Sequence, residues 1–177
     1  MAADDLVIEA GYGLDDANSY ITVDEFLTYI DTRNLSVSAS SDHDLIAGLL
    51  IKAKDYLEGK RSCYKGQKAT QAQKLQWPRV NVTIDGFCFP SDDIPDQLKD
   101  AQARLAYDMD ANSLDEASPT LLPGDTGAIV KEKVDVLEVQ YANPSASSQR
   151  TKPKYTEADS LLQPLCKGGG GAFFVKA

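Results

Sequence analysis

The sequence has one histidine, three widely spaced cysteines and no run of 18 or more apolar residues. A membrane-spanning helix needs about 20 such residues, so no span is predicted. The N-terminus, MAADDLVIEAGYG, lacks the basic start and apolar block of a signal peptide. Cys63, Cys88 and Cys166 form no CxxC pair, so we expect neither a zinc site nor a disulfide framework, but inert thiols in a reducing cytoplasm.

The motifs of common catalytic sites are also missing. There is no Walker loop, no GxSxG and no dinucleotide-binding fingerprint. His43 lies between two aspartates at a predicted helix start, which favours a surface or capping position over a general base. Acids before and within a later helix could hold a hard cation, but a charged first helical turn is the commoner explanation: Asp92, Asp93, Asp96 and Asp100. We therefore predict no enzyme, no metal and no cofactor.

The net charge of −9 conceals four blocks of alternating sign. Residues 1–50 have a net charge of −9, residues 51–80 of +6, residues 81–130 of −8 and residues 131–177 of +2. Complementary patches of this kind steer association and fix its register, which favours head-to-tail contact between copies of the chain. Ordinary solvated faces are the alternative explanation.

Apolar periodicity predicts most of the regular structure. The second predicted helix has the longest apolar stripe, from Leu45 to Leu57. Asp85-Gly86 predicts the turn of a short hairpin within residues 80–89. The β-branched segment 127–141 predicts two strands or one bent strand, with a register shift at Asp135. The expected helices are 22–32, 41–59, a short 70–76, 94–111 and a last one capped by Thr156.

These elements predict an α+β fold that is mainly α. It has a three- to four-helix core, a small β element and an extended C-terminal arm. We expect a helical domain over residues 1–142, which includes the β element at 127–141. Residues 143–177 would then form a linker, a short helix and a flexible arm, because NPSASSQRTKP and four consecutive glycines are linker-like.

Two segments are candidate contact sites. The first is basic and includes Lys60, Arg61, Lys65, Lys68, Lys74 and Arg79. Such cations could neutralise DNA phosphates, with Tyr56, Tyr64 and Trp77 as stacking partners. However, Tyr56 lies on an apolar stripe, Trp77 precedes Pro78, and the chain is acidic overall, so we favour the positive half of a subunit contact.

The second candidate site is the C-terminal end piece AFFVKA, which follows the glycines 168–171. Ordering glycine costs the most backbone entropy, so the glycine run makes it costly to hold Phe173, Phe174 and Val175 in the domain's own core. A tail of this kind is predicted to dock on a partner, for example by adding a strand to a sheet edge. A disordered terminus that the domain's own surface covers loosely is the alternative.

In order and spacing, six segments resemble a known family of small tailed-phage proteins. They are GYGLDDANSYITVDEF, LIAGLLIKAKDYLEG, LQWPRVNVTIDG, IPDQLKDAQARLAYD, VKEKVDVLEVQYAN and LLQPLCKGGGG. Trp77-Pro78-Arg79 is the most specific part. Members are labelled DnaT-like single-stranded-DNA-binding proteins, are encoded among virion structural genes and are similar to head-to-tail adaptor (connector) proteins of the phage neck.

The resemblance implies a structural virion protein made in the host cytoplasm. It would form a homo-oligomeric ring, commonly a dodecamer, that binds the portal above and tail or neck proteins below. Genomic DNA would pass through the lumen, and no membrane would be involved. The tail Phe173, Phe174 and Val175 would dock on the portal, while Trp77 and Pro78 would be structural. The alternative function is a single-stranded-DNA-binding replication accessory protein.

Overall fold

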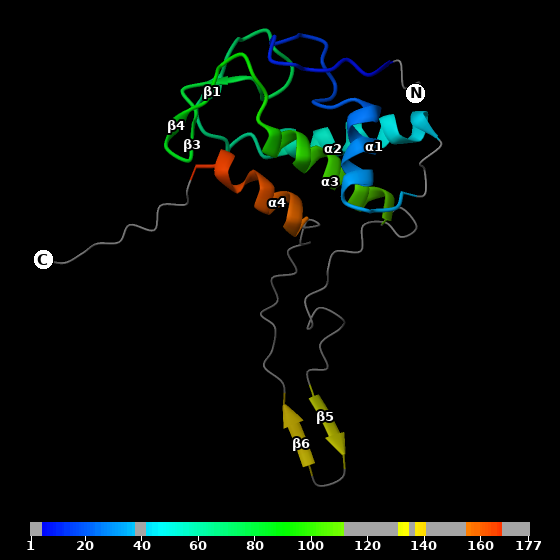
Figure 1. Ribbon diagram of the computed structural model, residues 1–177. Helices are drawn as coiled ribbons and strands as arrows, with labels where there is room; N and C mark the ends of the chain where they lie inside the picture. The colour runs from blue at the N-terminus through cyan, green and yellow to red at the C-terminus, as the bar shows by residue number, and fades with distance from the viewer. Residues whose placement is uncertain (1–4, 38–41, 112–130, 135–136, 141–154, 168–177) are drawn as a thin grey trace, which may run out of the picture. The chain divides into compact units, whose positions relative to one another are not determined.

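The computed structural model describes residues 5–37, 42–111, 131–134, 137–140 and 155–167. The chain divides into two units, residues 1–114 with 155–177, and residues 115–154. The described residues contain four α-helices and short antiparallel strand pairs (Figure 1), so the predicted mainly α fold with a small β element is confirmed. The predicted C-terminal arm, residues 168–177, lies outside the described residues.

Helices α1 (Val23–Thr32) and α2 (His43–Gly59) begin as the sequence predicts. Thr22 accepts from the Glu25 N–H, while the Glu25 carboxylate accepts from the Thr22 N–H, which completes a capping box. Asp42 accepts from the Leu45 N–H and is therefore the N-cap of α2. His43 is exposed at the first position of α2.

Helix α3 (Asp96–Ala111) packs against both α2 and α4 (Thr156–Leu162), and all three contribute to one hydrophobic core. The fully buried side chains include one from each helix: Leu50, Leu105 and Leu162. A single-turn 3-10 helix, η2 (Gln163–Leu165), follows α4. Helix α4 thus lies in the first unit, which differs from the predicted boundary at residue 143. Among the described residues, no helix is both long and apolar enough to cross a membrane.

The strands are short and pair in twos. Strands β1 (Gln67–Lys68) and β2 (Arg79–Val80) are antiparallel, as are β3 (Thr83–Ile84) and β4 (Phe87–Cys88). Asp85 and Gly86 both have positive φ, 51° and 88°, as a type I′ turn requires, so the predicted hairpin is confirmed. In the second unit, β5 (Lys131–Val134) pairs with β6 (Leu137–Gln140) in register, which confirms the two-strand alternative.

The N-terminal arm is irregular, as predicted, and is organised by one buried carboxylate. Glu9 is fully buried and accepts from the backbone N–H groups of Gly11, Gly13 and Leu14 at 2.7–2.9 Å. Gly11 has φ +108°, and a Cβ there would lie 2.0 Å from the Asp92 carbonyl oxygen. Only glycine therefore fits this close approach.

Two local predictions are wrong. The expected helix 70–76 does not form, although Thr70 and Gln73 make both hydrogen bonds of a capping box. The Gln73 amide instead donates to the carbonyls of Leu75 and Pro78, which fixes an irregular turn. Thr156 is the first residue of α4 rather than its cap, because the N-cap position belongs to Tyr155 and has no side-chain hydrogen bond.

We expect Glu9→Gln to lower the free energy of unfolding by about 3 kcal/mol, because a buried amide cannot accept all three N–H groups. Urea denaturation followed by circular dichroism measures this. The control is Glu25→Gln, which alters one exposed capping bond and should cost less than about 1 kcal/mol. Equal losses in the two variants would contradict the organising role of Glu9.

Candidate functional site

The predicted basic segment connects the end of α2 to strand β2, and most of its cations are hydrogen-bonded within the protein. Arg79 is the clearest case, since it is only 6% exposed. Its guanidinium donates to the backbone carbonyls of Lys65, Gly66 and Gln76, at 2.7, 2.9 and 3.2 Å. Burial lowers the pKa of Arg79, because removing the charged guanidinium from water is unfavourable. Arg79 is therefore a brace inside the fold.

Three lysines of the segment also donate to backbone carbonyls. The Lys65 ammonium contacts Thr83 at 3.0 Å and Pro164 at 2.8 Å, so it joins β3 to η2. Lys68 donates to the Gln73 carbonyl. Lys74 donates to the Asp16 carbonyl and keeps an exposed stem. These bonds supply donors to four backbone carbonyls, of which only that of Thr83 belongs to a strand.

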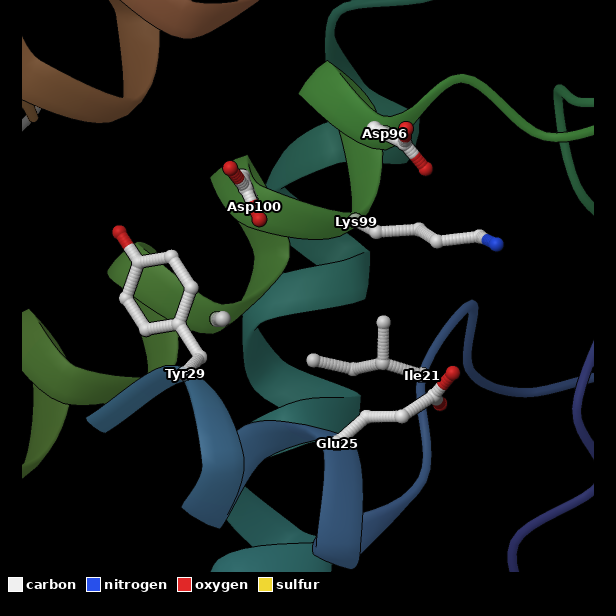
Figure 2. A pocket seen from close by; sticks show the side chains of 7 residues that line it. Ile21, Glu25, Tyr29, Asp96, Lys99 and Asp100 are labelled. Carbon is white, nitrogen blue, oxygen red and sulfur yellow. The ribbon is translucent and has the colours of Figure 1, made fainter. Parts of the chain in front are cut away.

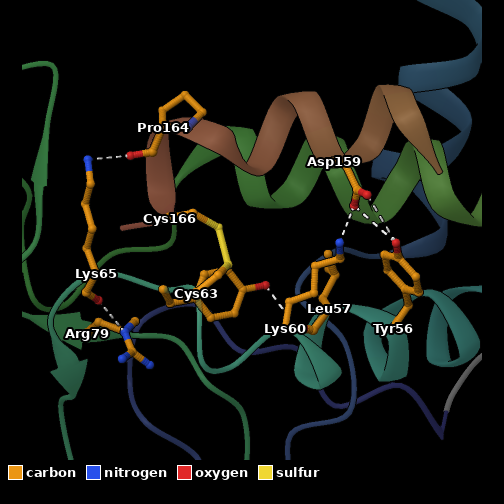
Figure 3. Close-up of a disulfide and its surroundings, with 10 residues drawn as sticks. Tyr56, Leu57, Lys60, Cys63, Lys65, Arg79, Asp159, Pro164 and Cys166 are labelled. Atoms are coloured by element: carbon orange, nitrogen blue, oxygen red, sulfur yellow. Dashed lines mark hydrogen bonds and ion pairs between the residues drawn. A yellow bond between two sulfur atoms is a disulfide. The ribbon is translucent and has the colours of Figure 1, made fainter. Parts of the chain in front are cut away.

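Lys60 is paired across the helix interface. Its ammonium lies 2.6 Å from the Asp159 carboxylate of α4, and the Tyr56 hydroxyl donates to the same carboxylate at 3.1 Å (Figure 3). Burial by itself would lower the pKa of Lys60. The hydrogen bonds to Asp159 and Tyr56 have the opposite effect and outweigh burial, so the pKa of Lys60 is raised. Lys60 thus stabilises the docking of α4 on α2.

The same region joins two cysteines, which corrects the expectation of three inert thiols. Cys63 and Cys166 form a disulfide with Cα atoms 4.8 Å apart (Figure 3). Cys88 is free and exposed. Tyr64 and Cys166 make an antiparallel bridge, and the Lys167 N–H donates to the Cys63 carbonyl. The cysteines are 103 residues apart in sequence, so no local spacing could reveal the pair.

Arg61 differs from the other cations of the segment. It is exposed, and no ion pair or hydrogen bond of its side chain is seen within the described ranges. Lys167, which follows the disulfide, is likewise exposed and unpaired there. Of the six predicted contact residues, the structure thus leaves Arg61 most available to a partner.

Trp77 and Pro78, for which the sequence predicts a structural role, lie inside the fold. Trp77 is fully buried, precedes a cis peptide bond and packs edge-on against Tyr64 and Phe89. The Tyr20 hydroxyl accepts from the Trp77 N–H at 3.3 Å and donates to Glu58 at 2.6 Å. Burial, then the Glu58 carboxylate, raises the pKa of Tyr20, so the hydroxyl stays protonated. Trp77 and Tyr64 are therefore unavailable for base stacking.

A surface pocket of about 350 Å³ lies between α1 and α3 (Figure 2). Its polar lining is mainly acidic, with Glu25, Asp96 and Asp100 against Lys99. Asp100 also pairs with Arg33 at 3.2 Å. The balance of charge suits a cationic group of a partner better than a phosphate. Asp96 and Asp100, two of the four acids considered as a cation site, thus line this pocket. Its other lining residues are Ile21, Tyr29 and Ala103.

Two exposed aromatic residues were not singled out from the sequence. Tyr12 is 81% exposed in the loop held by Glu9, and Phe87 is 78% exposed in the β3–β4 hairpin. The Asp85-Gly86 turn could have indicated that Phe87 directly follows a hairpin tip. The predicted tail residues Phe173, Phe174 and Val175 lie outside the described residues.

Comparison with known proteins gives one match. A family model described as "Putative DnaT-like ssDNA binding protein" matches residues 5–177, nearly the whole chain. The searches of curated proteins and of solved structures found no match to the chain. The match agrees with the family resemblance of the six sequence segments.

We expect Arg79→Gln to lower the free energy of unfolding by about 3 kcal/mol, because it removes several hydrogen bonds from a buried cation. Arg61→Gln, which removes the same charge from an exposed position, should change it by less than about 0.5 kcal/mol. Urea denaturation of both variants measures this. A large loss in Arg61→Gln would show that Arg61 is also a structural brace.

Proposed function

We propose that this chain binds single-stranded DNA, because it belongs to the family of DnaT-like single-stranded-DNA-binding proteins. The observation that carries the proposal is the family match over residues 5–177. The protein acts by binding and catalyses no reaction. Its net charge of −9 opposes non-specific attraction of a polyanion, so binding depends on a local cluster of available cations.

The available cations are fewer than the sequence suggests. Lys60, Lys65, Lys68 and Arg79 already make ion pairs or hydrogen bonds inside the fold. A phosphate could share the Lys65 ammonium but could not reach Arg79, which is 6% exposed. We therefore propose few phosphate contacts, with Arg61 among them, and a modest affinity rather than the tight binding of a strongly basic protein.

Fluorescence anisotropy of a labelled oligothymidylate tests this function. We expect binding at low salt that weakens as salt rises, with a log–log slope of about −0.7 for each phosphate contact. A duplex of the same length should compete more weakly. Absence of binding at 20 mM salt and micromolar protein, or equal binding of duplex, would contradict the proposal.

A second candidate function is that of the head-to-tail adaptor in a tailed-phage virion. Alternating charge blocks and the acidic pocket between α1 and α3 favour it, because a closed ring needs two different, complementary faces on each copy. The ring, commonly of twelve copies, would bind the portal and tail or neck proteins and surround the genomic DNA. The tail Phe173, Phe174 and Val175 would dock on the portal.

Native mass spectrometry with and without the portal protein tests the adaptor function. We expect a closed ring on the portal, and we expect deletion of residues 168–177 to abolish portal binding while the far-UV circular dichroism stays unchanged. A deletion variant that still binds the portal would remove the docking role of the tail. A chain that binds oligonucleotide but forms no ring and no portal complex would leave single-strand binding alone.

A further inference from the structure

The β3–β4 hairpin presents an aromatic side chain to solvent at an unusual place. Phe87 directly follows the Asp85-Gly86 turn and is 78% exposed, whereas Phe89, two residues later, packs on Trp77. Leaving a phenyl ring in water forgoes the favourable free energy of burying it. The backbone at Phe87 belongs to a ladder rather than to a free loop, because Thr83 pairs with Cys88 and Ile84 with Phe87. The backbone that carries the ring is therefore fixed.

Cations lie on the segments joined to this hairpin. The Lys65 ammonium donates to the carbonyl of Thr83 in β3. The residues beside Lys65 pair with the segment ending at Lys167, since Tyr64 and Cys166 form an isolated antiparallel bridge, the Lys65 N–H donates to Leu165 and the Lys167 N–H donates to Cys63. Arg61, four residues before Lys65, is exposed. We call Phe87 with Arg61, Lys65 and Lys167 the hairpin patch; the one acid in the turn is Asp85.

We propose that the hairpin patch is the single-strand contact, with one base stacked on Phe87 and the flanking phosphates on Arg61 and Lys167. This deepens the proposed function and rests on it. Every base has a π-face, so an exposed ring among cations binds single strands with little sequence preference. A duplex hides its base faces in the stack, and the patch would then offer only its cations.

Tyr12 shows why exposure alone is insufficient. It is as exposed as Phe87 and is also held rigidly, by the loop that Glu9 organises. Its surroundings are acidic, however: Asp15, Asp16 and Asp92 are all exposed near this loop. The Lys74 ammonium also lies against this loop, at the Asp16 carbonyl, but the three acids outnumber it and repel phosphates. Tyr12 is therefore a matched control, an exposed aromatic residue in a mainly acidic neighbourhood.

The test compares Phe87→Ala with Tyr12→Ala in oligothymidylate binding by anisotropy. We expect Phe87→Ala to weaken binding roughly 5- to 150-fold, the range for loss of one stacked base, and Tyr12→Ala to leave it within twofold. Both side chains are exposed, so thermal melting should be unchanged in both variants. Wild-type-like affinity of Phe87→Ala, with the wild type binding, would overturn the hairpin patch while the proposed function stands.

The cations are tested by the double variant Arg61→Gln/Lys167→Gln against Lys52→Gln. Lys52 is exposed on α2 two turns before the helix ends and lies outside the patch. We expect the double variant to reduce the salt slope by about 1.4 and Lys52→Gln to leave it unchanged. Equal slopes would overturn the patch.

If the wild type binds no oligonucleotide, the proposed function and the patch both fail. If Phe87→Ala changes only the self-association of the protein, the patch is a protein contact and the inference is overturned.

Discussion

The buried contact between Tyr20 and Glu58 is the constraint on which the rest of the structure depends. Tyr20 comes from the N-terminal arm and Glu58 from the last turn of α2, and their side chains meet at 2.6 Å. Together they hold the backbone N–H groups of Trp77 and Gln76, at 3.3 and 3.1 Å. The arm, the main helix and the turn before β2 are thus fixed at one point. Without it, a segment of two-residue strands would have little to define its path, since isolated short hairpins are marginally stable in water.

The irregular backbone of this region explains why so many cations of the basic segment are hydrogen-bonded inside the fold. Irregular segments and short strands leave backbone carbonyls without regular partners, and a buried carbonyl without a donor is costly. Long side chains with several donors can reach such carbonyls, as Arg79 does from β2 and Lys65 from the bend before β1. A charge-assisted bond is stronger than a neutral one, which offsets part of the desolvation cost. The basic block is therefore first a means of stabilising an irregular region, and only its exposed remainder can serve a partner.

The sequence predicted what local patterns determine. The apolar stripe from Leu45 to Leu57 and the Asp85-Gly86 turn act within a few residues, and both predictions hold. The capping pair Thr70 and Gln73 misled, because its hydrogen bonds form in a turn as readily as in a helix when a buried amide has better partners nearby. The Cys63–Cys166 bond and the docking of α4 on α3 were missed, since both join segments far apart in sequence, 103 residues for the two cysteines. The partners of the basic residues were not predictable for the same reason: a charge is visible in the sequence, but the carbonyl or carboxylate that it contacts in the fold is not.

An acidic protein that binds DNA requires the field to be local rather than global. At physiological salt, exposed charges more than about 8 Å apart are largely screened from one another. A single DNA strand bound at the β3–β4 hairpin would therefore respond mainly to the nearby cations and to Asp85. The acids of the pocket between α1 and α3 would contribute little to the potential at the hairpin. Those acids still repel DNA from the surface around them. The same distribution of acidic and basic side chains would serve either proposed function. The lumen of an adaptor ring must also let the genomic DNA pass without binding it tightly. The two functions differ in whether the exposed ring of Phe87 meets a base or another protein.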